Sequence, residues 1–161
     1  MAFAEMLEFG KQYAEQVVTN AKALGQALHE RGIGAIAENK EFTESHQIVV
    51  DVSKYGLGGD MERALESANI ILNRQLIPGD IQAGRHYQNP GDLPIGTPEV
   101  TRLGMKKNEM AEIAEFIKRI VVKKEDPKKV KQDVADFRKS FQDVHYCFKS
   151  TKKAYEYIKL R

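Results

Sequence analysis

Residues 68–105, ANIILNRQLIPGDIQAGRHYQNPGDLPIGTPEVTRLGM, contain a short apolar run followed by a long polar segment rich in glycine and proline. Three of the chain's five prolines (Pro78, Pro90 and Pro94) and four glycines lie within residues 75–96. Because proline lacks an N–H group and interrupts both helices and sheet ladders, this composition predicts a loop. A loop of this length inside a compact domain is usually functional or disordered.

Both ends of the predicted loop are apolar. Ile70–Leu72 and Ile95 have the character of buried strand residues, and they would fix the loop to a core on either side. Attachment at both ends favours a functional loop over a disordered one. We therefore expect this loop to contact whatever the protein recognises.

The first thirty residues predict one long helix. Apolar and small residues recur at alternating steps of four and three from Phe3 to Leu28, and the helix should end at Arg31–Gly32. No capping side chain stands at its start, which suggests a helix that continues from a longer chain. The same seven-residue repeat could form a coiled-coil seam, but its Gly and Ala positions favour close packing on the protein's own domain or on a partner.

Short strands and further helices follow. Residues 33–37 and 46–52 are predicted to be paired strands, and a short helix is expected over residues 60–68. Two more amphipathic helices are predicted, one capped by Asn108 and one capped by Asp126 with a proline at its first position. This order predicts an α/β fold, a two-layer sandwich of a small sheet with helices packed on it, preceded by the long amphipathic helix.

Composition and charge set further bounds. A chain of 161 residues with 42% hydrophobic and 30% charged residues predicts a single domain over residues 1–161, with no membrane segment. The single cysteine, Cys147, excludes an internal disulfide, and the acidic start is unlike a secretory signal, so we expect a cytoplasmic protein. Residues 1–117 carry 11 Lys and Arg against 17 Asp and Glu, whereas residues 118–161 carry 14 against 6. The basic C-terminal extension, residues 123–161, could bind nucleic acid, but a solvated basic face is favoured and no nucleic-acid partner is expected.

The residues themselves predict neither a metal site nor a complete catalytic centre. The four histidines are far apart in the sequence and lack the spacings of metal ligands. Residues 79–84 match the glycine spacing of a phosphate loop, but Arg85 and His86 follow where lysine and a hydroxyl residue are needed. No lysine stands in an apolar stretch, and no order of Ser, His and Asp suggests a triad.

Several ungapped stretches nevertheless carry a resemblance. The segment NPGDLPIGTPEVTRLG (residues 89–104) and the IPGD before it resemble the C-terminal part of serine hydroxymethyltransferase, particularly its archaeal branch. The resemblance extends over nearly the whole chain, in the right order, through AEMLEFGKQYAEQVVTNAKAL, FTESHQIVVDV, ANIILNRQLIPGD, GTPEVTRLGMKKNEMAEIAEFI and DFRKSFQDVHYCF.

The resemblance implies the small domain of a homodimeric fold-type I pyridoxal-phosphate enzyme. Such an enzyme interconverts serine and glycine and transfers one carbon to a reduced pterin, either tetrahydrofolate or tetrahydromethanopterin. The Schiff-base lysine and most contacts to pyridoxal phosphate would belong to a preceding large domain. We therefore expect the chain alone to be inactive and to have the large domain and a second subunit as its partners.

Two site residues follow from the resemblance. Gln75 takes the position of an asparagine that contacts the pterin in the family. Pro94 takes the position of the arginine that binds the substrate carboxylate, and Asp92 adds a like charge that would repel that carboxylate. Arg85 or Arg102 could bind the carboxylate instead if the fold brings them near. The alternative to an active enzyme is a non-catalytic paralogue or interaction module that has lost the carboxylate clamp.

Overall fold

The computed structural model describes residues 2–76 and 79–159, except for the side chains of Tyr155 and residues 157–159. Pro78, one of the three loop prolines, lies outside the described residues. In chain order the elements are α1 (Ala2–Glu30), β1 (Gly34–Ala35), the 3₁₀ turn η1 (Glu38–Lys40), β2 (Gln47–Asp51), α2 (Gly58–Ser67), β3 (Asp92–Gly96), α3 (Pro98–Arg102), α4 (Lys107–Val121), α5 (Pro127–Arg138) and α6 (Thr151–Lys159).

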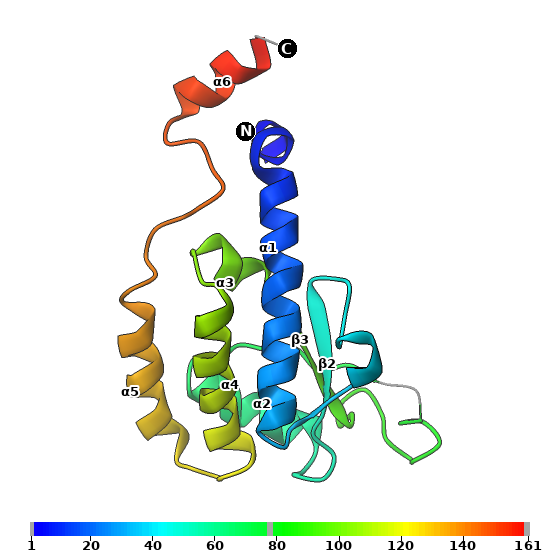
Figure 1. Ribbon diagram of the computed structural model, residues 1–161. Coiled ribbons are helices and arrows are strands. Elements are labelled where there is room, and N and C mark those ends of the chain that lie inside the picture. Colours follow the sequence, from blue (N-terminus) through cyan, green and yellow to red (C-terminus); the bar gives the residue numbers. More distant parts are fainter. Residues whose placement is uncertain (1, 77–78, 160–161) are drawn as a thin grey trace.

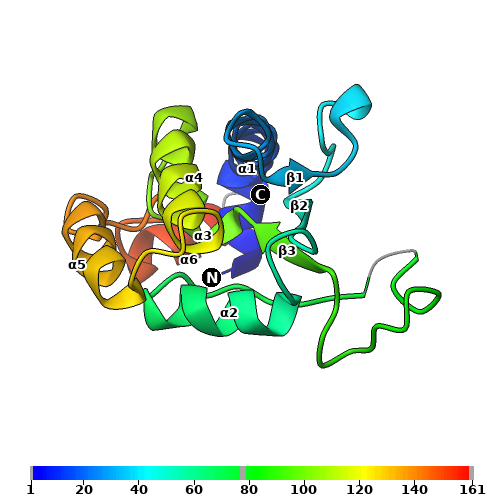
Figure 2. The ribbon, with the colours of Figure 1, turned by 90° about the horizontal axis from the view of Figure 1, so that it is seen from below.

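The architecture is the predicted α/β arrangement of a small sheet covered by helices. Within the described residues, three strands form an antiparallel sheet in the order β1-β2-β3. Figure 2 shows α1 and α4 lying side by side over the sheet, with α2 on the other side of the body. The predicted helices are confirmed: α1, α2, α4 and α5 all form close to their expected ranges.

The long helix α1 has two different halves. Its C-terminal half is buried along the predicted stripe through Val17, Ala21, Leu24 and Leu28. Its N-terminal half extends past the sheet (Figure 1), and Phe3 on the same stripe is 89% exposed.

The first two strands pair as predicted but are shorter than expected. β1 covers only two residues, with Gly34 opposite Asp51 and Ala35 opposite Val50. β1 ends early because the chain turns away at Ala37, whose backbone has a left-handed conformation with φ of 64°. β2 pairs along its whole length with β3, from Gln47 opposite Gly96 to Asp51 opposite Asp92.

The predicted loop is wrong at its C-terminal end, because residues 92–96 form β3 and Pro94 stands in the middle of that strand. Pro94 lies opposite Val49. Because proline has no N–H to donate, Pro94 and Val49 must form a pair that exchanges no hydrogen bonds. The backbone groups of Pro94 then point away from β2, toward the outer edge of the sheet. An edge strand therefore tolerates this proline.

The predicted strand at Ile70–Leu72 is also wrong. The segment is irregular, and its first pairing with β3 is a single bridge between Gln75 and Asp92. Continuing that antiparallel register would place residue 73 opposite Pro94, where the outer edge offers no N–H group. The proline thus ends the ladder after one bridge, and Ile71 is left 81% exposed.

One helix cap differs from the prediction and one agrees with it. α4 begins at Lys107 with Lys106 as its N-cap, so the expected cap Asn108 lies inside the first turn. The carboxylate of Glu109 accepts a hydrogen bond from the Lys106 N–H and so satisfies the helix start. At α5 the expected cap is confirmed, because the Asp126 side chain accepts the N–H of Lys128 at 3.0 Å.

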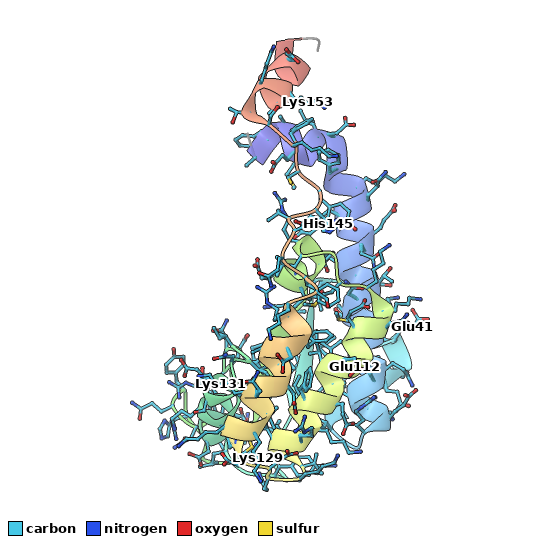
Figure 3. The ribbon with its side chains drawn as sticks, turned by 90° about the vertical axis from the view of Figure 1, so that its left-hand side faces the viewer. Glu41, Glu112, Lys129, Lys131, His145 and Lys153 are labelled. Carbon is cyan, nitrogen blue, oxygen red and sulfur yellow. The ribbon has the colours of Figure 1, made fainter. Side chains whose placement is uncertain are left out.

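The residues after α5 run back along α1. Figure 3 shows this segment rising from α5 past His145 to α6, beside the N-terminal half of α1. The His145 N–H donates to the carbonyl of Arg102 at 2.8 Å. The rings of Tyr146 and Phe148 pack against Tyr13 and Phe9 of α1, with centroids 5.3 and 5.2 Å apart. The basic extension therefore contacts the body of the protein through aromatic side chains.

Replacing either of two glycines of α1 by alanine should change the stability of the chain, in opposite directions for the two positions. A Cβ at Gly25 would stand 2.7 Å from Cγ and 2.8 Å from Cβ of Phe42, whereas a Cβ at Gly10 would meet only Met6, at 3.8 Å. Overpacking costs about 1–3 kcal/mol, and replacing a helical glycine by alanine gains about 1 kcal/mol. We predict that Gly25→Ala lowers the free energy of unfolding and that Gly10→Ala, its matched control, raises it. Urea denaturation of the two variants tests this, and stabilisation by Gly25→Ala would contradict the packing of Phe42 on α1.

Candidate functional site

The loop between α2 and β3 folds back onto the start of β3 through one ion pair. The guanidinium Nη1 of Arg85 donates to Oδ1 of Asp80 at 2.9 Å, and Oδ2 of Asp80 accepts the N–H of Gly91 at 3.0 Å. Asp80 is 1% exposed, so this is a buried carboxylate with charge-assisted partners. The pair holds Arg85 against the backbone just before Asp92, where a Cβ on Gly91 would lie 2.0 Å from Nη1.

A second arginine, Arg74, connects the loop to α2. Arg74 pairs with Glu62 of α2 at 3.2 Å, and its guanidinium stands 5.8 Å from the ring centroid of Tyr87. The loop is therefore attached to β3 by Arg85 and to α2 by Arg74.

The carboxyl group of Asp92 is the most unusual group at this site. Asp92 is 1% exposed, and neither of its side-chain oxygens has a hydrogen-bond partner among the described residues. Burial, followed by the negative charges of Asp80 and Asp51, raises the pKa of Asp92 to about 7. The backbone N–H of Asp92 itself, and then the charge of Arg85, act in the opposite direction but do not offset them.

The structure brings three of the candidate positions together. Gln75 bridges to Asp92, Arg85 lies beside the same residue, and Pro94 is two residues further along β3. Leu93 and Ile95 point into the core, so Asp92 and Pro94 share the opposite face of the strand. Gln75 is exposed, which leaves its amide accessible to a ligand.

Arg102 lies elsewhere. It is in the last turn of α3, and its Nη2 donates to the carboxylate of Glu5 on α1 at 2.9 Å. Its guanidinium also stands 6.0 Å from the ring centroid of Tyr13. Arg102 thus joins α3 to α1, in contacts unrelated to those of Arg85.

Two residues of this site were not singled out from the sequence. Asp80 and Asp51 are ordinary acidic residues in a turn and at a strand end, and nothing in their local pattern indicates that one is buried and that the other faces Asp92. The only available signal was the IPGD turn quoted for the resemblance. Among the described residues there is no cluster of three His, Cys, Asp or Glu side chains suited to a metal ion, and none of the helices described could cross a membrane.

The raised pKa of Asp92 predicts how stability depends on pH. In the folded chain the Asp92 carboxyl group keeps its proton up to about pH 7, whereas an Asp in the unfolded chain loses its proton at about pH 3.9. Between these values the folded state binds more protons, so its stability should fall as pH rises from about 4 to about 7. We predict that Asp92→Asn flattens this fall and leaves the variant more stable than the unsubstituted chain at pH 8. Urea denaturation at a series of pH values measures both, and an unchanged slope would show that Asp92 ionises normally.

Comparisons with known proteins agree with one another. A family model described as serine hydroxymethyltransferase matches residues 1–117. The serine hydroxymethyltransferase of Nitrosopumilus maritimus is 57% identical over 161 residues, which are all of this chain and 37% of the relative. That of Methanocaldococcus jannaschii is 49% identical over 152 residues, covering 92% of this chain and 35% of its own length.

The fold has a solved counterpart. The crystal structure of L-threonine transaldolase from Pseudomonas fluorescens in its internal aldimine state superposes with a TM-score of 0.81 at 31% sequence identity. The match covers 99% of this chain and 36% of that one. The chain therefore spans little more than a third of the proteins that it matches. On the family model and on this identity to its archaeal relatives, the chain belongs to the serine hydroxymethyltransferase family.

Proposed function

We propose that this chain is the C-terminal part of a pyridoxal-phosphate enzyme that interconverts serine and glycine, with one-carbon transfer to a reduced pterin. The observation that supports this most is the identity of 57% to a serine hydroxymethyltransferase over the whole chain. As the resemblance implies, the full-length enzyme acts as a cytoplasmic homodimer. Pyridoxal phosphate, when bound, stabilises negative charge at the α-carbon of the amino acid.

The role of this part is recognition. All lysines whose burial is described are at least partly exposed, so none has the apolar surroundings that lower the pKa of a Schiff-base lysine. The portion of the relatives that this chain does not span would then hold the cofactor. Gln75, exposed at the edge of β3, would contact the pterin through an amide one methylene further from the backbone than in the family.

Carboxylate recognition is the weak point of this chain. Arg85 lies near Asp92, two residues before position 94, but it already pairs with Asp80, and Asp51 adds a further negative charge near Asp92. A substrate carboxylate approaching this face would meet more negative than positive charge, so Arg85 is a poor replacement for an unpaired arginine. This observation also favours the second candidate function, a non-catalytic relative that has kept the fold.

The chain alone should fold without becoming an enzyme. We predict that the 161-residue chain gives a cooperative unfolding transition, yet neither develops the absorbance of lysine-bound pyridoxal phosphate nor converts serine to glycine. Absorbance titration with the cofactor and an assay of glycine formation test this, with the enzyme from Nitrosopumilus maritimus as the positive control. Serine turnover by this chain alone would overturn the division of roles.

Restoring a cation at position 94 should restore substrate binding. In the full-length protein we predict that Pro94→Arg tightens glycine binding about tenfold or more, since a charge-assisted bidentate pair contributes several kcal/mol. Pro94 is buried within β3, contrary to the exposed loop position expected from the sequence, but its backbone faces the outer edge, where an added N–H disturbs no ladder bond of β2. Glycine affinity can be measured from the spectral shift of the bound cofactor.

Pro94→Met is the matched control, because methionine removes the proline ring without adding a charge. It should bind glycine as weakly as the unsubstituted protein. Tight glycine binding in all three forms would mean that another cation, with Arg85 first, holds the carboxylate. Absence of glycine binding in all three would favour the non-catalytic alternative.

A further inference from the structure

The loop before β3 is attached to the body in two places. Its last residues are fixed by the backbone, since the N–H of Gly58 in α2 donates to the carbonyl of Pro90 at 2.9 Å. The turn of residues 79–85 is held to them by the carboxylate of Asp80, which accepts the N–H of Gly91 at 3.0 Å. This turn can therefore part from β3 while the last residues of the loop stay in place.

The turn of residues 79–85 is compact and has room to move. The N–H of Arg85 donates to the carbonyl of Asp80 at 2.8 Å and closes the turn on itself. A Cβ added to Gly79 or to Gly84 would meet nothing within 4 Å. Figure 2 shows the loop projecting from the edge of the body. A movement of this turn would leave the core undisturbed.

Three carboxyl groups meet where the turn contacts β3. Asp51 and Asp92 stand directly opposite each other in β2 and β3, which brings their Cβ atoms to about 4.5–5.5 Å from each other. Asp80 comes from the turn, with its carboxylate on the N–H of Gly91, the residue before Asp92. Arg85 is the cation that acts on Asp92 from the turn, and it already pairs with Asp80. Two charged carboxylates therefore already share one arginine.

The charged side chains of the neighbouring α2 are engaged elsewhere. α2 approaches the start of β3 closely, because a Cβ on Gly58 would lie 3.0 Å from the carbonyl oxygen of Asp92. In its next turn, Asp60 pairs with Arg63, and Glu62 pairs with Arg74, which precedes the loop. The charges that act on Asp92 are thus those of β2 and of the turn.

Asp92 itself is buried without a partner. It is 1% exposed, and both of its side-chain oxygens lack a hydrogen-bond partner among the described residues. A neutral carboxyl group is far easier to bury in this way than a carboxylate, which needs a paired charge or several donors. Burial, followed by the charges of Asp80 and Asp51, accordingly raises the pKa of Asp92 to about 7. The closed loop is suited to the protonated form of Asp92.

We propose that the turn of residues 79–85 is a proton-operated latch, which lies closed on β3 while the Asp92 carboxyl group carries a proton and opens when that proton is lost. The sheet fixes Asp51, so repulsion displaces the group that can move, which is Asp80 with the turn behind it. Opening admits water to the carboxylates. Because Gln75 bridges to Asp92, the same proton governs the surroundings of Gln75. A consequence for pterin binding would rest on the proposed function, but the latch does not.

The strength of the latch depends on how far closing shifts the pKa of Asp92. In the open loop Asp92 is in water, where its pKa takes the ordinary value of about 3.9. Closing raises the pKa to about 7. Between these values the closed state binds one more proton, so the ratio of closed to open loop falls by up to about tenfold for each unit that the pH rises. Above the upper value the ratio becomes constant.

Hydrogen exchange of the Gly91 amide in the 161-residue chain tests the latch, since this N–H is bonded to Asp80 in the closed loop. Rates measured by NMR are divided by the intrinsic rate at each pH to give protection factors. We expect the protection of Gly91 to fall about tenfold or more between about pH 5 and about pH 7. The amide of Ile117 inside α4 should stay more strongly protected throughout. Constant protection of Gly91 would overturn the latch, and equal protection of the two amides would show global unfolding in its place.

Two variants assign the effect to Asp92. Asp92→Asn keeps the shape of the neutral acid without a titrating proton, so the protection of Gly91 should change by less than about twofold over the same range. His86→Gln is the matched control, because a histidine in the same loop can also change its charge there. It should leave the fall intact. A fall that persists in Asp92→Asn, or that His86→Gln abolishes, would contradict the proposal.

A direct titration keeps the proposal testable if Asp92→Asn does not fold. The carboxyl carbon of Asp92 in the unsubstituted chain is followed by NMR as the pH is raised. Its midpoint should lie near 7, where the fall in Gly91 protection ends. A midpoint near the ordinary value of about 3.9 would show that the closed loop holds no proton on Asp92, and the latch would be wrong.

Discussion

The antiparallel pairing of β2 with β3 is the interaction on which the rest of the structure depends. It places Leu93 and Ile95 in the core under α1 and α4, and it directs Asp92 and Pro94 to the other face. A bridge of Gln75 to Asp92 then brings the beginning of the long loop next to the start of β3. A shift by one residue would exchange the two faces and bury the aspartate in the apolar core.

Helix positions could be predicted from the sequence because they depend on local periodicity. The stripe of α1, the apolar positions of α4 and the Asp126 cap of α5 all depend on residues a few positions apart. The strands were harder, because pairing depends on residues far apart in the chain. Pro94 was expected in a loop, since nothing local shows that its missing N–H would face an unpaired edge.

At the candidate site, too, local features could be predicted and long-range features could not. The resemblance identified positions 75 and 94, and Arg85 was considered as a replacement for the missing arginine. The fold brings Gln75 and Arg85 to the start of β3, two residues before Pro94. What the sequence could not supply is the electrostatic setting. The burial of Asp80 and the unpaired oxygens of Asp92 depend on how the loop folds back, and the position of Asp51 opposite Asp92 depends on the pairing of β2 with β3. The position of Arg102 could not be predicted for the same reason, because its partner Glu5 lies 97 residues earlier in the chain.

The proline in β3 also affects how copies of this chain meet one another. A sheet edge with free N–H and C=O groups is a template on which a strand of another molecule can add. Pro94 removes the donor at the centre of that edge, and the bridge of Gln75 to Asp92 occupies one end of it. Pro94 therefore protects the sheet against edge-to-edge aggregation. A form of this protein with arginine at position 94 would need another means of protecting that edge, such as the charge of the arginine itself.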